Sequence, residues 1–165
     1  MAKQKTLCIL DINIYIILSY HTRMEILNIC LYLFTRFSVH KVWLPKMVAA
    51  ELSKKRTHHI QKVFEVISSI VPIEECPIKN RATKETIEKE CGLDEGESDA
   101  IMQIVEARYL SKESRNRYFI LNLKPLFITN DKQAYQCSYV QENAVYWRET
   151  IADDILAHLG IPVMK

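Results

Sequence analysis

The sequence predicts an α/β domain with a short, mostly parallel central sheet. Short apolar segments, which are typical of buried strands, alternate along the chain with longer segments whose apolar residues recur at helical spacing. The chain has 165 residues, 48% hydrophobic and 25% charged, which is an ordinary globular composition. This length predicts one domain, covering 1–165, with no linker or internal repeat.

The strands and helices are predicted in alternating order. The predicted strands are 6–10, 42–44, 71–73 and 126–129, with a weaker candidate at 118–121. The predicted helices are a short one starting near Asp11, then 24–37, 45–52, 57–70, 79–91, 95–109, 131–139 and a C-terminal extension helix at about 149–160. Pro45 suits a first helical turn, and Gly92 and Gly160 suit helix ends. The charged segment 111–117 is predicted to be a loop.

Charge and cysteine usage exclude several classes of protein. The formal net charge of +2 is too small to indicate nucleic-acid binding from bulk charge alone. The five cysteines are widely spaced, with no C-x-x-C or Cys/His cluster, so a structural zinc site is not expected. An odd number of scattered thiols favours a reduced, cytoplasmic protein. No apolar run is long enough to predict a membrane segment, and no signal peptide is expected.

Acidic residues follow two of the predicted strands. Asp11 ends the first strand, and Asp131 follows the strand at 126–129. Parallel α/β sheets bind ligands at the carboxyl ends of their strands, so these two side chains are candidates for a shared site. The alternative is that each Asp only caps the next helix, which Asp does commonly.

Further acids occur on two predicted helices. Glu51 lies on the helix that follows the second strand, among small and apolar residues. Glu97 and Asp99 lie where the helix at 95–109 begins, although acids in a first turn also stabilise a helix electrostatically. Ideal helical spacing places Glu97 on an apolar stripe and Asp99 about 200° away from it. The two would converge only if the helix begins within this segment, so that Glu97 is not yet helical.

Four motifs in this order resemble those of the PIN-domain nucleases. Asp11-Ile-Asn13 resembles the opening D-x-N of that family, and Glu51 in Val-x-x-Glu-Leu resembles its second acid. Gly96-Glu-Ser-Asp-Ala-Ile101 resembles the helix start that supplies the third acidic group, and Thr129-Asn-Asp131 resembles the closing T-x-D. The resemblance covers about 5–140. It implies a three-layer α/β/α fold and a metal-dependent nuclease that acts mainly on RNA.

The resemblance also implies roles for individual residues. Asp11 and Asp99 would be the principal ligands of Mg²⁺ or Mn²⁺, the hard cations that carboxylates prefer. Glu97 would be an additional or water-mediated ligand, Asp131 would complete the site, and Glu51 would orient or deprotonate the attacking water. Asn13 and Thr129 would hydrogen-bond these carboxylates. Homodimerisation, a small inhibitory protein and a role as the toxin of a toxin–antitoxin pair are further implications.

Alternatives remain open at this point. The basic residues Lys54, Lys55 and Arg56 fit a phosphate-binding rim and a solvated turn equally well. A catalytically silent scaffold or RNA-binding module would keep the fold and the acids without cleaving RNA. A phosphatase-like hydrolase with a carboxylate nucleophile would require D-x-D after the first strand, and Asn13 counts against it. The insert at 111–124 and the chain beyond 140 match no feature of the resembled family.

Overall fold

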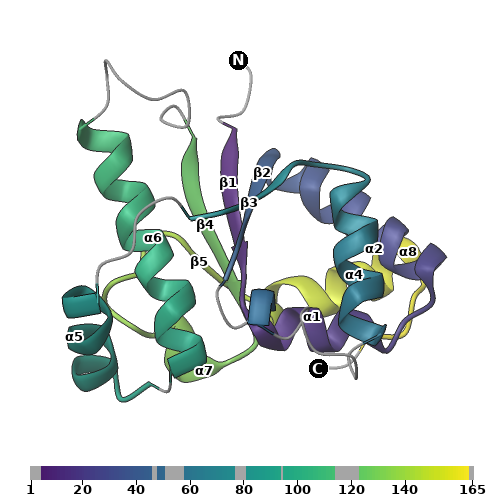
Figure 1. Ribbon diagram of the computed structural model, residues 1–165. Helices are drawn as coiled ribbons and strands as arrows, with labels where there is room; N and C mark the ends of the chain where they lie inside the picture. The colour runs from purple at the N-terminus through teal and green to yellow at the C-terminus, as the bar shows by residue number, and fades with distance from the viewer. Residues whose placement is uncertain are drawn as a thin grey trace.

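A parallel sheet with the strand order β3-β2-β1-β4-β5 forms the centre of the computed structural model (Figure 1). The strands are β1 (Thr6–Leu10), β2 (Val39–Leu44), β3 (Ile73–Glu75), β4 (Lys124–Thr129) and β5 (Ala144–Tyr146). The structure describes residues 5–45, 48–50, 58–76, 81–93, 95–113 and 123–163. The predicted α/β class with a parallel sheet is therefore confirmed.

Helices cover both faces of the sheet, which gives three layers (Figure 1). One layer contains α1 (Ile12–Ser19), α2 (Arg23–Arg36), α4 (His58–Ser68) and α8 (Ala152–Leu159). The other contains α5 (Arg81–Cys91), α6 (Glu95–Glu113) and α7 (Lys132–Tyr135). No helix among the described residues is both long and apolar enough to cross a membrane.

The central strand β1 is buried along its whole length because both of its faces pack on helices. Leu7 and Ile9 belong to the core beneath α5 and α6, whereas Cys8 and Leu10 belong to the core beneath α1 and α2. Successive side chains of a strand point to opposite faces, so a strand covered on both faces must be apolar throughout. This explains the uninterrupted apolar run that ends at Asp11.

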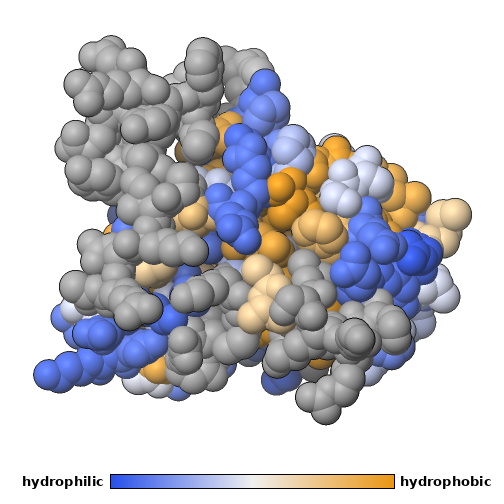
Figure 2. All heavy atoms as spheres, viewed as in Figure 1, coloured by the Kyte–Doolittle hydropathy of each residue, from blue (hydrophilic) through white to orange (hydrophobic). Residues whose placement is uncertain are grey.

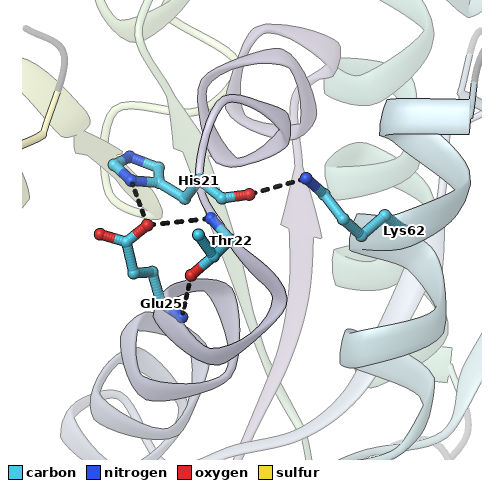
Figure 3. Close-up of polar contacts among 4 residues, drawn as sticks. All are labelled: His21, Thr22, Glu25 and Lys62. Carbon is cyan, nitrogen blue, oxygen red and sulfur yellow. Dashed lines mark hydrogen bonds and ion pairs between the residues drawn. The ribbon is translucent and has the colours of Figure 1, made fainter.

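The turn between α1 and α2 is fixed by reciprocal hydrogen bonds (Figure 3). The Glu25 N–H donates to the Thr22 hydroxyl at 3.2 Å, and the Thr22 N–H donates to the Glu25 carboxylate at 2.9 Å. The bonds from Thr22 hold the pKa of Glu25 below its ordinary value. Lys62 of α4 donates to the carbonyl of His21 at 2.7 Å. The capping box therefore fixes the start of α2, and the bond from Lys62 ties the turn after α1 to α4.

Several predicted boundaries differ from the observed ones. Strand β2 starts at Val39, before the predicted 42–44, and β3 lies at 73–75 instead of 71–73. Helix α6 continues to Glu113, so the predicted loop is wrong for 111–113, and α7 ends at Tyr135, well before 139. The candidate strand at 118–121 lies outside the described residues. Of the helix predicted at 45–52, the structure describes 48–50 as helical.

Strand β5 was not predicted. It has three residues and pairs with β4, and among the described strands it lies at the edge of the sheet. So short a segment shows no recognisable periodicity in the sequence. The chain then forms a π-helical turn at Trp147–Ile151 before α8, and Gly160 ends α8 with a φ of 66°, so the predicted stop at this glycine is confirmed.

Candidate functional site

Asp11 lies at the carboxyl end of the central strand and is fully buried. One carboxylate oxygen, Oδ1, accepts from the backbone N–H of Ile12 at 2.8 Å, which makes Asp11 the N-cap of α1. The other, Oδ2, accepts from the Thr129 hydroxyl at 2.8 Å and from the Asn13 amide at 3.2 Å. A buried carboxylate is costly unless donors surround it, and these three donors offset that cost.

Asn13 and Thr129 join the end of β1 to the end of β4. Asn13 accepts from the backbone N–H of Asn130 at 2.9 Å through its side-chain oxygen, while its amide also donates to Thr129 at 3.3 Å. The amide of Asn13 therefore acts as donor and acceptor together, which an aspartate at this position could not do. This requirement gives a physical reason for D-x-N instead of D-x-D after β1.

Asp131 lies directly after β4 and is half-buried. Its backbone N–H donates to the Thr129 hydroxyl at 3.0 Å, and its side chain accepts from the N–H of Ala134 at 3.0 Å. The Thr129 hydroxyl thus contacts both acidic segments. Asp131 is also the N-cap of α7, so the capping role considered for both aspartates is confirmed.

Asp99 lies inside α6 and is 3% exposed. Gln103, one helical turn further on, donates to the carbonyl of Leu44, the last residue of β2, at 3.1 Å. Helix α6 packs against β1 and β4, so the turn that carries Asp99 lies near the carboxyl edge of the sheet. The helix begins at Glu95, as predicted, so the backbone at Glu97 is already helical and the late helix start that would let Glu97 converge with Asp99 is not observed.

A lysine stands beside this aspartate. Lys84 of α5 places its ammonium 3.9 Å from Asp99 Oδ1, and both side chains are largely buried. The preceding residue of α6, Ser98, donates to Glu88 of α5 at 2.7 Å. Further along, burial raises the pKa of the Glu106 carboxyl. Helix α6 therefore carries several polar and charged groups into the interior of the protein.

Part of the predicted site lies outside the described residues. This applies to Glu51, to the basic residues Lys54, Lys55 and Arg56, and to the side chain of Glu97. Among the residues that are described, no three His, Cys, Asp or Glu side chains are close enough together to hold a metal ion. The described site therefore contains the Asp11–Thr129–Asp131 connection and, on α6, the Asp99–Lys84 pair.

Three features of this region were not predicted. Lys84 and Gln103 belong to no recognised motif in the sequence. Their contacts depend on how α5, α6 and β2 pack together, which the sequence does not reveal. The Cys91–Cys137 disulfide joins the end of α5 to the segment after α7, and the expectation of reduced thiols is wrong for this pair. The other three cysteines, Cys8, Cys30 and Cys76, are buried thiols. Cysteine spacing alone could not reveal the pairing.

Comparisons with known proteins give no family. No protein-family model, curated protein or solved structure matches this chain. The resemblance to the PIN-domain nucleases, which depends on the four motifs, therefore stays a prediction.

Proposed function

We propose that this protein is a metal-dependent endoribonuclease. The observation that carries the proposal is the fully buried Asp11 at the carboxyl end of the central strand, held by Thr129 and Asn13. Parallel α/β sheets bind their ligands at this edge. Asp131 follows the neighbouring strand, and Asp99 lies on the helix that packs over both strands.

The donor chemistry of these residues suits Mg²⁺ or Mn²⁺. Carboxylate oxygens are the ligands that these hard cations prefer, and Mg²⁺ commonly keeps several waters while it binds one or two carboxylates. A set smaller than three protein ligands is therefore compatible with Mg²⁺. When bound, the cation would lower the pKa of a coordinated water and neutralise charge on the phosphodiester. In this proposal Asp11 and Asp99 are the principal ligands of the cation. Glu97 is an additional or water-mediated ligand, and Asp131 completes the site.

The other residues would orient these carboxylates. Thr129 and Asn13 donate to one oxygen of Asp11 and so fix the direction in which the carboxylate faces. Lys84 lies close enough to Asp99 to compete with a cation in the absence of substrate, or to contact a phosphate when substrate is bound. Glu51 would orient or deprotonate the attacking water, and Lys54, Lys55 and Arg56 would contact the RNA backbone.

RNA cleavage tests the proposal directly. Purified protein is incubated with single-stranded and structured RNA in Mn²⁺, Mg²⁺ or EDTA, beside Asp11→Asn. Asp153→Asn, which removes an exposed carboxylate from α8, is the matched control. We expect cleavage that requires the metal, falls by about 100-fold or more in Asp11→Asn, and persists in the control. Equal activity of Asp11→Asn and wild-type protein, at equal folding, would refute the catalytic role.

A second candidate is a catalytically silent scaffold or RNA-binding module. It is favoured by the capping roles of Asp11 and Asp131 and by Lys84, which supplies positive charge beside Asp99 without a metal. This candidate predicts RNA binding that neither EDTA nor Asp11→Asn alters, and no cleavage product under any condition. The same cleavage experiment, with a gel-shift measurement beside it, therefore separates the two functions.

The cellular context is also part of the proposal. A cytoplasmic toxin that forms a homodimer and is blocked by a small inhibitory protein would need an apolar contact surface. Large hydrophobic residues are exposed on the α1, α2 and α8 side, namely Ile16, Tyr20, Met24, Leu31 and Leu156. Figure 2 shows both hydrophobic and strongly hydrophilic residues on the side of the molecule where α2 and α4 lie. Light scattering of the purified protein tests for the dimer.

A further inference from the structure

The disulfide between Cys91 and Cys137 connects two segments that carry proposed site residues. Cys91 is the last residue of α5, just before the turn into α6, which carries Asp99. Cys137 follows α7, the helix that Asp131 caps. The Cα atoms of the two cysteines are 5.7 Å apart, a normal separation for a disulfide, although 46 residues separate them in the sequence.

Other contacts hold the same two segments together. The Gln133 amide donates to the carbonyls of Cys91 and Gly92, at 2.9 Å and 3.0 Å. The Tyr139 hydroxyl donates to Glu90 at 2.6 Å. These contacts are exposed, so each contributes little on its own, and they lie around the disulfide that joins the same two segments.

Gly92 makes this close approach possible. Its φ is +63°, and a Cβ atom there would lie 2.8 Å from the Gln133 amide nitrogen. A residue with a side chain would therefore push Gln133 away and adopt a strained backbone. The contact between the end of α5 and α7 thus depends on local geometry as well as on the two sulfurs.

Cys91 differs from the other four cysteines in accessibility. It is half-buried at a helix end, whereas its partner Cys137 and the thiols Cys8, Cys30 and Cys76 are buried. Burial raises the pKa of the Cys30 thiol to about 12 and that of Cys8 higher still. Because the thiolate is the reactive form, these thiols are poor nucleophiles at neutral pH. Cys91 is the better placed to react with a small molecule.

We propose that Cys91 and Cys137 form a reversible redox site that sets the position of α6 relative to α7 and, through it, the cation affinity of the acidic site. The small-molecule partner is a disulfide of the glutathione type. The effect on cation affinity rests on the proposed nuclease function, whereas the redox chemistry and its effect on α7 do not.

The chemistry is thiol–disulfide exchange. The Cys91 thiolate attacks one sulfur of the small disulfide, which breaks its S–S bond, forms a mixed disulfide and releases one small thiol. The Cys137 thiolate then attacks the Cys91 sulfur, which closes the protein disulfide and releases the second small thiol. Two protein thiols are oxidised and one small disulfide is reduced to two thiols. The two thiol protons end on the two released thiols, and the reverse reaction opens the bond.

The redox step is tested on the full-length protein in buffers with different ratios of reduced to oxidised glutathione. Thiols are alkylated after rapid unfolding in denaturant and located by mass spectrometry. We expect Cys91 and Cys137 to lose their label together as the buffer becomes oxidising, while Cys8, Cys30 and Cys76 keep theirs at every ratio. A pair that remains alkylated in the oxidising buffer would overturn the proposal.

The effect on the site is tested by Mn²⁺ titration of the oxidised and reduced protein. We expect reduction to weaken Mn²⁺ binding by about threefold or more, because the segments that position Asp99 and Asp131 gain freedom. The variant Cys91→Ser/Cys137→Ser should bind equally in both buffers and match the reduced wild type. Cys76→Ser, which removes a thiol outside the pair, should keep the redox response. Equal Mn²⁺ affinity of the oxidised and reduced wild type would overturn the effect on the site.

Failure of the nuclease proposal remains distinguishable from failure of this one. If neither redox form binds Mn²⁺, the nuclease proposal fails. The redox proposal is then tested by backbone amide exchange of α7 and of the first turn of α6. Faster exchange in the reduced protein than in the oxidised protein would support the redox site without the metal. Equal exchange in the two forms would overturn it.

Discussion

The hydroxyl of Thr129 connects the two acidic segments, and replacing it tests the central geometry of the candidate site. Thr129 is fully buried, donates to Asp11 at 2.8 Å and accepts from the backbone N–H of Asp131 at 3.0 Å. Thr129→Val keeps nearly the same shape but removes both bonds, together with the longer bond that the hydroxyl accepts from the Asn13 amide at 3.3 Å. Thr129→Ser is the matched control, because it keeps the hydroxyl and loses only a methyl group.

The magnitudes follow from these contacts. A hydrogen bond to a charged group contributes about 1.5–3 kcal/mol, and an orphaned buried N–H costs about 1 kcal/mol or more. Loss of a buried methyl group costs about 1 kcal/mol. We therefore expect Thr129→Val to reduce the free energy of unfolding by roughly 3–4 kcal/mol and Thr129→Ser by roughly 1 kcal/mol. The difference between the two variants corresponds to a Tm difference of about 4–12 °C for a domain of this size.

Urea and thermal unfolding followed by circular dichroism measure these differences. If the valine variant is as stable as the serine variant, the Asp11–Thr129–Asp131 hydrogen bonds do not contribute to the free energy of unfolding. If the valine variant is less stable yet binds Mn²⁺ as tightly as the wild type, Thr129 supports the fold without orienting a metal ligand. The two readouts thereby separate the structural role of Thr129 from its proposed functional role.

Three further predictions concern the α5–α6–α7 layer. Reduction of the Cys91–Cys137 bond, which spans 46 residues, should lower the free energy of unfolding by up to roughly 4 kcal/mol in urea titrations, and a reductant-insensitive midpoint would contradict this. Gly92→Ala should destabilise the protein by about 1 kcal/mol or more, because a left-handed backbone is strained for alanine and the new Cβ would meet Gln133 at 2.8 Å; unchanged thermal stability would argue against that contact. Burial raises the pKa of Glu106 in the folded state, so the stability that its protonated form contributes is present below its ordinary pKa and is lost as the pH rises. The stability of Glu106→Gln relative to wild type should therefore increase as the pH rises above the ordinary pKa of glutamate, and a pH-independent difference would refute the shift.

Local patterns in the sequence were sufficient for the α/β class and for most of its elements. The apolar run from Thr6 to Leu10 predicts a strand buried on both faces, and β1 occupies the same residues. Gly160 predicts the end of the last helix, because glycine readily adopts the left-handed backbone that ends a helix. Its φ of 66° confirms this reason. These predictions succeed because side-chain periodicity and helix termination depend on residues that are close in the sequence.

The ends of helices and strands, and the shortest strand, were predicted less well than the longer elements themselves. The charged residues at 111–113 suggest a loop, yet α6 continues through them as part of a long helix. Strand β5 has three residues, and it is a strand only because β4 lies beside it. For β5, pairing with a neighbouring strand decides the local structure, and no pattern within the segment reveals that neighbour.

The candidate site was likewise predictable from the sequence only in part. The sequence by itself determined which carboxylates follow the strands, and it supplied the D-x-N and T-x-D motifs on which the nuclease prediction depends. Only the tertiary structure decided that Thr129 donates to Asp11 across 118 residues, that Lys84 lies beside Asp99, and that Cys91 bonds to Cys137. These contacts join residues far apart in the chain, and they exist because the order of the strands brings the ends of β1 and β4 together while α5, α6 and α7 pack over the same face of the sheet.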